Sequence, residues 1–341
     1  MRRPLIDAML SDETVEALLS DESQLEAMLR VEIALAKAEA TAGLISDDAA
    51  RAIERGLGEF APDWDDLAEG MRRDGVMVPR LVAQMRAAVG SEHAAALHKG
   101  ATSQDIVDTA LMLQLGPILG LYYEHIEALL SGLRAVTARD GAKPLMAHTR
   151  MQPALPFTVA AKLRAWIEPL EQHRRDLAAT TGLLSVQLGG PIGDRSSFAG
   201  TGDTIAAQMA EELGLADAPC WHASRTRIVT IGGHVSALSG TLGKIGADVG
   251  LLALTGAVAV AGGGTSSAMA HKSNPVAAEH LVALAHQNAA LVGALHHAMV
   301  HENERSGAAW TLEWLTLPQM LRNTAGALRI ATDLAQAITF R

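Results

Sequence analysis

Residues 262–275 read GGGTSSAMAHKSNP and interrupt a chain that is otherwise rich in alanine and leucine. The run lies between two long apolar segments, 226–257 and 275–303, whose periodicity predicts helices. Asn274 followed by Pro275 is a typical helix start, because asparagine caps the first turn and proline fits its first position. A glycine-rich turn before a helix presents free N–H groups, so the run is either a connector or one wall of an anion site.

The helical pattern extends through the rest of the chain in both directions. Near the N-terminus, Asp21 predicts the start of a helix that Gly43 ends, and Ser46 predicts the start of the next one. Further helices are predicted at 80–89, 108–139, 156–181, 226–257, 275–303 and 318–339. The later segments are long for globular helices, and no alternating strand pattern stands out. The sequence therefore predicts an all-α protein, with an N-terminal helical domain over residues 1–108 and a long central helical bundle over residues 109–341.

The composition narrows the class of protein. The 341 residues are 49% hydrophobic, which is enough for a large core. A net charge of -10, with no run of Lys or Arg longer than two, argues against a nucleic-acid partner. The single cysteine, Cys220, excludes an intramolecular disulfide, and the first residues lack the pattern of a signal peptide. Residues 249–270 are uncharged but glycine-rich, which favours a buried helix and a loop over a membrane span, so we expect a cytoplasmic protein with no membrane partner.

Three polar stretches stand out against this apolar background, and each precedes a predicted helix. They are 98–109 (HKGATSQDIVDT), 148–153 (HTRMQP) and 262–275. Any one of them alone is most simply a cap or a turn, because serine and threonine are common N-cap residues. Three such stretches, all rich in side-chain donors and all at helix N-termini, predict a shared pocket for carboxylates.

Together these stretches resemble the shared regions of the fumarase/aspartase superfamily, whose signature loop is commonly GSSxMPxKxNP. The order and spacing of the three regions agree, and the resemblance extends over residues 15–335. Further pieces are similar to the cycloisomerase branch of that superfamily: VEIALAKAEATAGLI, VQLGG, WHASRTR, SGTLGKIGADVGLL and ENERSGAAWTLEW. The resemblance implies a fumarase/aspartase-like bundle that acts on a small polycarboxylate. It also implies a homotetramer whose active sites are shared between subunits, with no cofactor and no metal.

Three features depart from the superfamily pattern. Ala270 replaces the proline of the signature, and the segment before the glycines, LTGAVAVAGGG, is short for the family. The chain also stops where the long bundle ends, so we expect the C-terminal domain of the superfamily to be missing from it. The first two departures affect the length and stiffness of the loop, and the third affects closure of the site and stability.

The resemblance also assigns roles to particular residues. Ser266 corresponds to the catalytic serine that moves the proton on carbon, and Lys272 is the cation that stabilises the charge developing in the reaction. The residues expected to bind the substrate are His98, Thr102, Ser103, Gln104, Arg150, Gln152, Arg225, Asn274 and Arg305. For each of the arginines taken alone, a surface salt bridge is an equal alternative.

Arg150 decides which reaction the resemblance favours. Many lyases of the superfamily carry histidine at this point of a GRTHxQ motif, where it serves the proton of the leaving group, whereas this chain reads AHTRMQ. Arginine stays protonated and cannot act as an acid or base, yet it binds a carboxylate through two hydrogen bonds. The substitution argues against elimination of water or an amine and fits lactonisation of a tricarboxylate, in which the carboxylate needs no proton. His148, at the arginine position of the motif, stays a candidate for a neighbouring role.

Two alternatives stay open at this stage. One is a lyase of the same superfamily acting on a succinyl-type substrate such as adenylosuccinate, which Arg150 opposes. The other is a non-catalytic homologue that kept the bundle, which Ala270 and the missing domain favour. A metal site at His297 and His301 has little support, because a third ligand and the HExxH motif are lacking. A nucleotide site has little support either, since no dinucleotide or P-loop glycine pattern is present.

Overall fold

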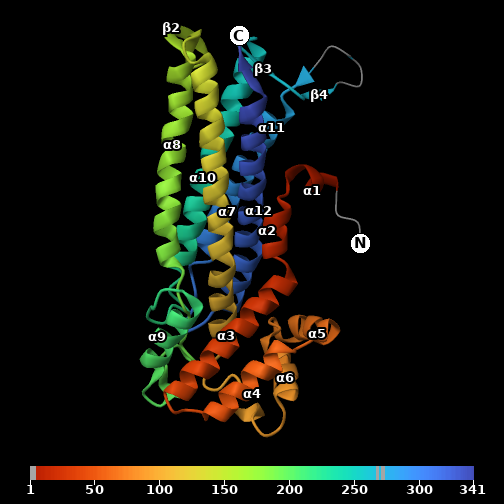
Figure 1. The fold of residues 1–341 in the computed structure, drawn as a ribbon, viewed down its shortest axis with the longest axis vertical. Coiled ribbons are helices and arrows are strands. Elements are labelled where there is room, and N and C mark those ends of the chain that lie inside the picture. Colours follow the sequence, from red (N-terminus) through yellow and green to blue (C-terminus); the bar gives the residue numbers. More distant parts are fainter. Residues whose placement is uncertain (1–4, 266–268, 270–272) are drawn as a thin grey trace.

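The computed structural model describes residues 5–265, Met269 and residues 273–341. Long helices run side by side along the molecule, most of the shorter helices gather at one end, which we call the base, and the two shortest lie against the side of the bundle (Figure 1). The long helices are α7 (Ser103–Asp140), α8 (Val159–Thr180), α10 (Thr226–Leu254), α11 (Val276–His297) and α12 (Gly307–Ala337). The shorter helices are α1 (Leu5–Leu10), α2 (Glu13–Leu18), α3 (Asp21–Thr41), α4 (Asp47–Gly58), α5 (Trp64–Asp74), α6 (Val78–Val89) and α9 (Gly202–Leu213).

Polar side chains cap the helices of the base close to where the sequence predicts. The Ser46 hydroxyl accepts a hydrogen bond from the backbone N–H of Ala49 at 3.2 Å, which confirms the predicted start of α4. The cap of α3 is Ser20, one residue before the predicted Asp21. A cap of this kind stabilises a helix by about 1 kcal/mol, so these starts follow from local sequence alone.

The start of α7 differs from the prediction and brings a polar stretch into the helix. Asp105 accepts a hydrogen bond from the backbone N–H of Thr102 at 3.0 Å, which closes the first turn. The helix therefore begins at Ser103 rather than at Asp108. The predicted domain boundary at residue 108 falls within this unbroken helix, and the division into two domains stays a prediction.

The predicted starts of α8 and α12 are wrong for two different reasons. Residue 156 belongs to a strand, and α8 begins after Thr158, whose hydroxyl accepts from the Ala161 N–H at 3.3 Å. Pro318 lies inside α12, which begins at Gly307 after the cap residue Ser306. Proline usually breaks a helix because it lacks an N–H, so tertiary packing of α12 overrides this local signal.

Short strands, which the sequence analysis did not predict, form three antiparallel pairs in the described part of the chain. They are β1 (Pro144–Thr149) with β2 (Gln152–Thr158), β3 (Val258–Val260) with β6 (Ile338–Phe340), and β4 (Gly264–Thr265) with β5 (Ser273–Asn274). The β1–β2 hairpin stands at the end of the bundle opposite the base (Figure 1). The prediction of a predominantly helical fold is confirmed, and the absence of strands is corrected.

Glycines let α10 approach α11 closely. A Cβ atom at Gly243 would lie 2.4 Å from the Ala285 Cβ, and one at Gly246 would lie 2.5 Å from the Ala278 carbonyl oxygen. Gly240 has open space around it, so it plays no part in this contact. By length and composition α7 and α10 could span a membrane, but both supply buried side chains to the bundle core, which accounts for their apolar character.

Candidate active site

The residues predicted to bind the substrate fall into two groups at opposite ends of the bundle. The first group, at the base, is His98, Thr102, Ser103, Gln104, Arg225 and Arg305. The second group, at the hairpin end, is Arg150, Gln152 and Asn274 (Figure 1). The 38-residue helix α7 separates them, and at 1.5 Å per residue it is about 57 Å long. A single copy of the chain therefore does not bring the two groups together.

Asp105 is the centre of the base and was not among the predicted site residues. Its carboxylate is fully buried and accepts hydrogen bonds from the backbone N–H groups of Gly189 at 2.7 Å and Gly190 at 3.0 Å. The Nε2 atom of His222 lies 2.8 Å from its Oδ1. Together with its bond to the Thr102 N–H, these contacts tie the start of α7 to the glycine turn. Asp105 thus holds the donors of the first polar stretch in place.

Arg225 is also fully buried, between two carboxylates. Its guanidinium donates to Asp108 at 2.6 and 3.1 Å and to Glu313 at 2.8 and 2.5 Å. Burial alone would lower the pKa of Arg225, but the two carboxylates outweigh it and raise the pKa above its usual value. Trp310 adds a hydrogen bond from its indole N–H to Asp108 at 3.0 Å. Because none of the Arg225 side chain is exposed, the geometry does not support its predicted contact with a substrate.

Gln104 has a different role from the predicted one. Its side-chain NH₂ donates to Asp108 at 3.2 Å and to the His222 carbonyl at 3.0 Å, and its side-chain oxygen accepts from the Arg305 Nε at 3.0 Å. The amide is buried and both of its ends are occupied, so it has no donor left for a carboxylate. Its bond to the half-buried Arg305 orients that guanidinium instead. We call Gln104, Asp105, Asp108, His222, Arg225, Arg305 and Glu313 the basal network.

His98 lies beside the basal network with the charge that a carboxylate site needs. Its backbone is in the left-handed region, with a φ of 59°, and its Nδ1 is 2.6 Å from the Glu32 Oε1. Burial acts to lower the pKa of His98, but Glu32 counteracts this and the pKa is raised. Close by, burial and the charge of Glu32 raise the pKa of Glu39 to about 8. The imidazolium of His98 is thus favoured by a carboxylate that the sequence analysis did not identify.

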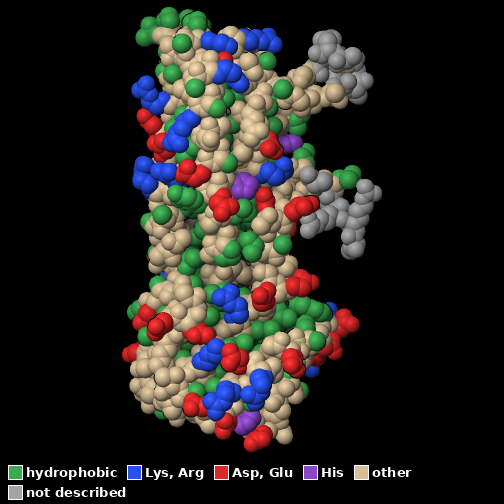
Figure 2. Space-filling model, viewed as in Figure 1, with side chains coloured by type: hydrophobic (Ala, Val, Ile, Leu, Met, Phe, Trp, Pro, Cys, Tyr) green, Lys and Arg blue, Asp and Glu red, His purple; other side chains and the backbone are tan. Residues whose placement is uncertain are grey.

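At the hairpin end most of the predicted site residues are exposed, whereas at the base they are buried or half-buried. Thr149 pairs with Gln152, which leaves Arg150 and Met151 as the turn, with φ angles of 48° and 63°. The side chains of Arg150 and Gln152 are exposed, and the guanidinium has no carboxylate partner within the ranges that the structure describes. Hydrophobic side chains cover the tip of the hairpin (Figure 2), among them Met151, which is 74% exposed. Exposed apolar and cationic groups side by side are typical of a surface that another molecule covers.

The structure describes the signature loop at its two edges and at Met269. Gly264 pairs with Asn274 and Thr265 with Ser273, so the glycines and the asparagine form the neck of the loop. A Cβ atom at Gly263 would lie 2.2 Å from the Ser273 Oγ, which leaves no room for any other residue there. Ser266, Lys272 and Ala270 lie outside the described residues. Their predicted roles are neither supported nor opposed by this geometry.

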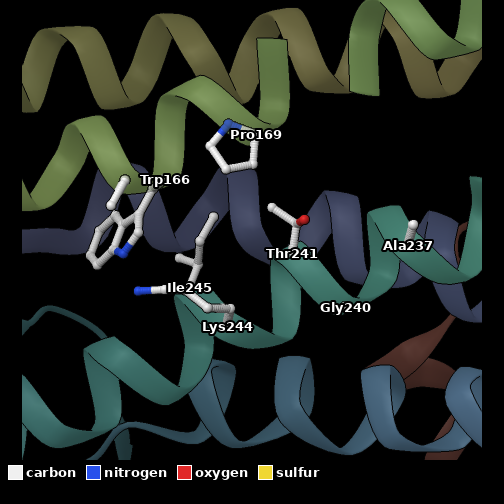
Figure 3. A pocket seen from close by; sticks show the side chains of 8 residues that line it. Trp166, Pro169, Ala237, Gly240, Thr241, Lys244 and Ile245 are labelled. Atoms are coloured by element: carbon white, nitrogen blue, oxygen red, sulfur yellow. The ribbon is translucent and has the colours of Figure 1, made fainter. Parts of the chain in front are cut away.

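Two cavities are lined by no residue of either group, although Glu313 of the basal network lines the larger one. One of about 300 Å³ opens between α8 and α10 and is lined by Trp166 and Lys244, among others (Figure 3). Burial lowers the pKa of Lys244 to about 8, and its ammonium group pairs with Asp248. The other cavity, of about 930 Å³, lies against α5 and α12 and is lined mainly by apolar side chains. Neither cavity contains a residue that the sequence analysis placed in the site.

No metal-binding cluster of three or more His, Cys, Asp or Glu side chains occurs among the described residues. His297, one of the two candidate metal ligands, is exposed, whereas the side chain of the other, His301, is buried 3.7 Å from Glu313. These two histidines do not share a surface. The charged side chains that the two groups of residues do present, on His98, Arg150 and Arg305, are cations, which suits an anionic substrate.

Comparison with known proteins agrees with this chemistry. The 3-carboxy-cis,cis-muconate cycloisomerase of Pseudomonas aeruginosa is 37% identical over 98% of this chain and 75% of its own length. The nitrosuccinate lyase of Streptomyces davaonensis is 36% identical over 98% of this chain and 74% of its own length. The crystal structure of the 3-carboxy-cis,cis-muconate lactonizing enzyme from Pseudomonas putida matches with a TM-score of 0.91 and 33% identity, over 99% of this chain and 78% of that one. Because the sequence model of the lyase family also matches residues 5–288, the chain belongs to the lyase family of the fumarase/aspartase superfamily.

Proposed function

We propose that this chain is an intramolecular lyase that converts 3-carboxy-cis,cis-muconate to 4-carboxymuconolactone, in the protocatechuate branch of the β-ketoadipate pathway of aromatic degradation. The observation that carries the proposal is Arg150 on the open hairpin turn, where a lyase that protonates its leaving group would need histidine. A guanidinium binds a carboxylate and cannot exchange a proton with it near neutral pH. The similarity to relatives that carry this name supports the same reaction.

In the proposed reaction, one carboxylate of the substrate adds to its conjugated diene and forms a C–O bond. The neighbouring carbon gains a proton, so the product is an isomer of the substrate. Ser266 is the group proposed to deliver that proton, and Lys272 with Asn274 stabilises the charge that develops on a second carboxylate. His98, Arg150 and Arg305 supply positive charge for three carboxylates, while Thr102, Ser103 and Gln152 supply hydrogen bonds.

The proposed site is assembled between copies of the chain. The length of α7 supports this proposal, because it separates Arg150 from His98 by the whole bundle within one copy. A second copy that runs antiparallel would bring its hairpin end to the base of the first. The exposed apolar side chains of the hairpin and the open surface of α10 at Gly240 suit such packing. We therefore propose a homotetramer with shared sites, located in the cytoplasm.

A second candidate is a lyase that acts on a succinyl-type substrate. The relative named nitrosuccinate lyase favours it, because nitrite, like a carboxylate, leaves as an anion without a proton. Arg150 is compatible with both substrates and opposes adenylosuccinate, whose leaving amine needs a proton. A non-catalytic protein is the third outcome that an assay has to separate.

The test is an ultraviolet assay with the purified protein. Lactonisation breaks the conjugation of 3-carboxy-cis,cis-muconate, so its absorbance should fall, whereas nitrosuccinate and adenylosuccinate should show no turnover. Ser266→Ala should lower turnover roughly 1,000-fold, within the range for a general acid. The control Ser91→Ala, at an exposed turn of the base, should keep the full rate. Turnover of nitrosuccinate alone would replace the proposal with the second candidate, and no turnover of any substrate would favour the non-catalytic protein.

A further inference from the structure

Cys220 is the single cysteine of the chain and lies beside the basal network. It is half-buried, on the segment that joins α9 to α10. The proposed reaction gives it no role. The reactivity of a thiol depends on the charged groups around it.

Two glycines show how close the thiol lies to His222. A Cβ atom at Gly193 would lie 3.4 Å from the Cys220 Sγ and 3.3 Å from the His222 Nδ1. One at Gly189 would lie 2.4 Å from the same Sγ and 2.8 Å from the His222 Cε1. The sulfur and the imidazole of His222 therefore share one small space, which a side chain at Gly189 would fill.

His222 has one ring nitrogen engaged and one without a partner. Its Nε2 lies 2.8 Å from the Asp105 Oδ1, and its side chain is 3% exposed. Its Nδ1 is buried and has no hydrogen-bond partner among the described residues. Burial acts to lower the pKa of His222, but Asp105 and Cys220 outweigh it and raise the pKa to about 9. The raised pKa favours the imidazolium, and the Nδ1 edge of the ring lies beside the sulfur.

A cysteine beside a histidine that a carboxylate orients is the arrangement that stabilises a thiolate, the nucleophilic form of the side chain. We propose that Cys220 is a reactive thiol that exchanges with small disulfides, and that this modification inactivates the protein. In the exchange, the Cys220 thiolate attacks one sulfur of the disulfide and forms a new S–S bond. The original S–S bond breaks, and its other half leaves as a thiolate, so Cys220 is oxidised and the leaving half is reduced.

The contacts of the glycine turn explain why modification should inactivate. Gly189 approaches the sulfur so closely that nothing fits between them, so a group added to the sulfur pushes on the turn or on His222. Gly189 of this turn and His222 are both hydrogen-bonded to Asp105, which also holds the start of α7. Arg305 donates to the Pro191 carbonyl of the same turn at 3.3 Å. The inactivation rests on the proposed function, whereas the reactivity of the thiol does not.

The first experiment measures reactivity alone. The full chain is treated at pH 6.5 with 2,2′-dithiodipyridine, a small neutral disulfide, and the released thione is followed by absorbance. We expect one equivalent per chain, at a rate at least ~10-fold above that of the same chain unfolded in urea, because an ordinary thiol is almost wholly protonated at this pH. His222→Gln should remove this advantage. A native rate equal to or below the unfolded rate would overturn the proposal.

The second experiment measures the consequence. Labelling should abolish turnover, dithiothreitol should restore it, and circular dichroism should show that the labelled protein keeps its helices. Cys220→Ala should turn over substrate normally and be insensitive to the disulfide. Complete labelling with full turnover would overturn the inactivation. A chain that labels rapidly but never turns over any substrate would count against the proposed function and leave the reactive thiol standing.

Discussion

At the base of the bundle, Arg225 lies between two carboxylates with none of its side chain exposed, whereas at the hairpin end Arg150 stands on an exposed turn without a carboxylate partner in the described ranges. Both arginines were predicted to bind the substrate. Their surroundings give them different roles. A buried charge is stable only when protein groups pair with it, while an exposed charge is available to a ligand. The same residue type thus stabilises the fold at one end and offers a binding group at the other.

The largest effect should come from breaking the base. Arg225→Met leaves Asp108 and Glu313 buried without a cation, and it should lower the free energy of unfolding by about 3–5 kcal/mol. Urea denaturation followed by circular dichroism measures this change. Arg227→Met is the matched control, because Arg227 also lies over the Trp221 ring but donates to the Leu183 carbonyl and the Ser185 hydroxyl rather than to a carboxylate.

A triple variant tests whether the unpaired carboxylates cause the loss of stability in Arg225→Met. Adding Asp108→Asn and Glu313→Gln to Arg225→Met removes the unpaired charges and should recover part of the lost stability. If Arg225→Met and Arg227→Met lower the free energy of unfolding by the same amount, the ionic pairing does not determine the stability of the base. The distinction between the two ends would then be wrong.

The next largest effect is the contribution of Glu39 to the pH dependence of the free energy of unfolding. Burial and the charge of Glu32 raise the pKa of Glu39 to about 8 in the folded protein, whereas a glutamate in the unfolded chain has its ordinary pKa of about 4.5. Between these values the folded state binds more protons, so the free energy of unfolding falls as the pH rises. We expect Glu39 to contribute a fall on the order of 3 kcal/mol between pH 5 and pH 8.

Denaturation of Glu39→Gln at the two pH values tests this contribution. The variant should lose most of the pH dependence, since glutamine does not titrate. Glu59→Gln, at an exposed site near the end of α4, should keep the dependence of the parent protein. An unchanged slope in Glu39→Gln would mean that Glu39 is ionised in the fold at neutral pH.

A smaller effect, on activity and not on stability, is expected at the hairpin end. Arg150→Ala should lower kcat/KM roughly 10- to 100-fold, because a bidentate carboxylate contact is lost. The urea midpoint should not move, since the exposed guanidinium has no carboxylate partner within the described residues. Arg150→Lys should recover only part of the activity, and Arg164→Ala, an exposed change on α8, should alter neither quantity. A loss of stability in Arg150→Ala would remove the contrast with Arg225.

The smallest effect is expected at an exposed ion pair of the base. Arg51 and Asp48 lie 2.6 Å apart, but their side chains are 59% and 79% exposed. Water screens such a pair, so Arg51→Ala should leave the urea midpoint unchanged within error. A clear shift would show that charge alone, without burial, decides stability at the base.

Several features of the protein could be predicted from the sequence, because their causes are local. Caps such as Ser46 and the periodicity of the apolar positions predict helices and therefore a predominantly helical fold, but not its short strands. The three polar stretches in their order identify the superfamily, since reactive groups recur at fixed spacings along the chain. The chemistry of Arg150 also follows from the residue type alone, because arginine does not exchange protons near neutral pH.

Only the tertiary structure decided which predicted residues are available to a ligand. Gln104 and Arg225 have the chemistry of substrate donors, but residues 88 to 201 positions away along the chain use up that capacity by folding against them. Asp105 and Glu32 were missed because a carboxylate in a sequence gives no sign of the cation or N–H that it will meet. The separation of His98 from Arg150 likewise depends on α7 remaining unbroken, and long-range packing, unlike capping or residue chemistry, is not a property of any short stretch.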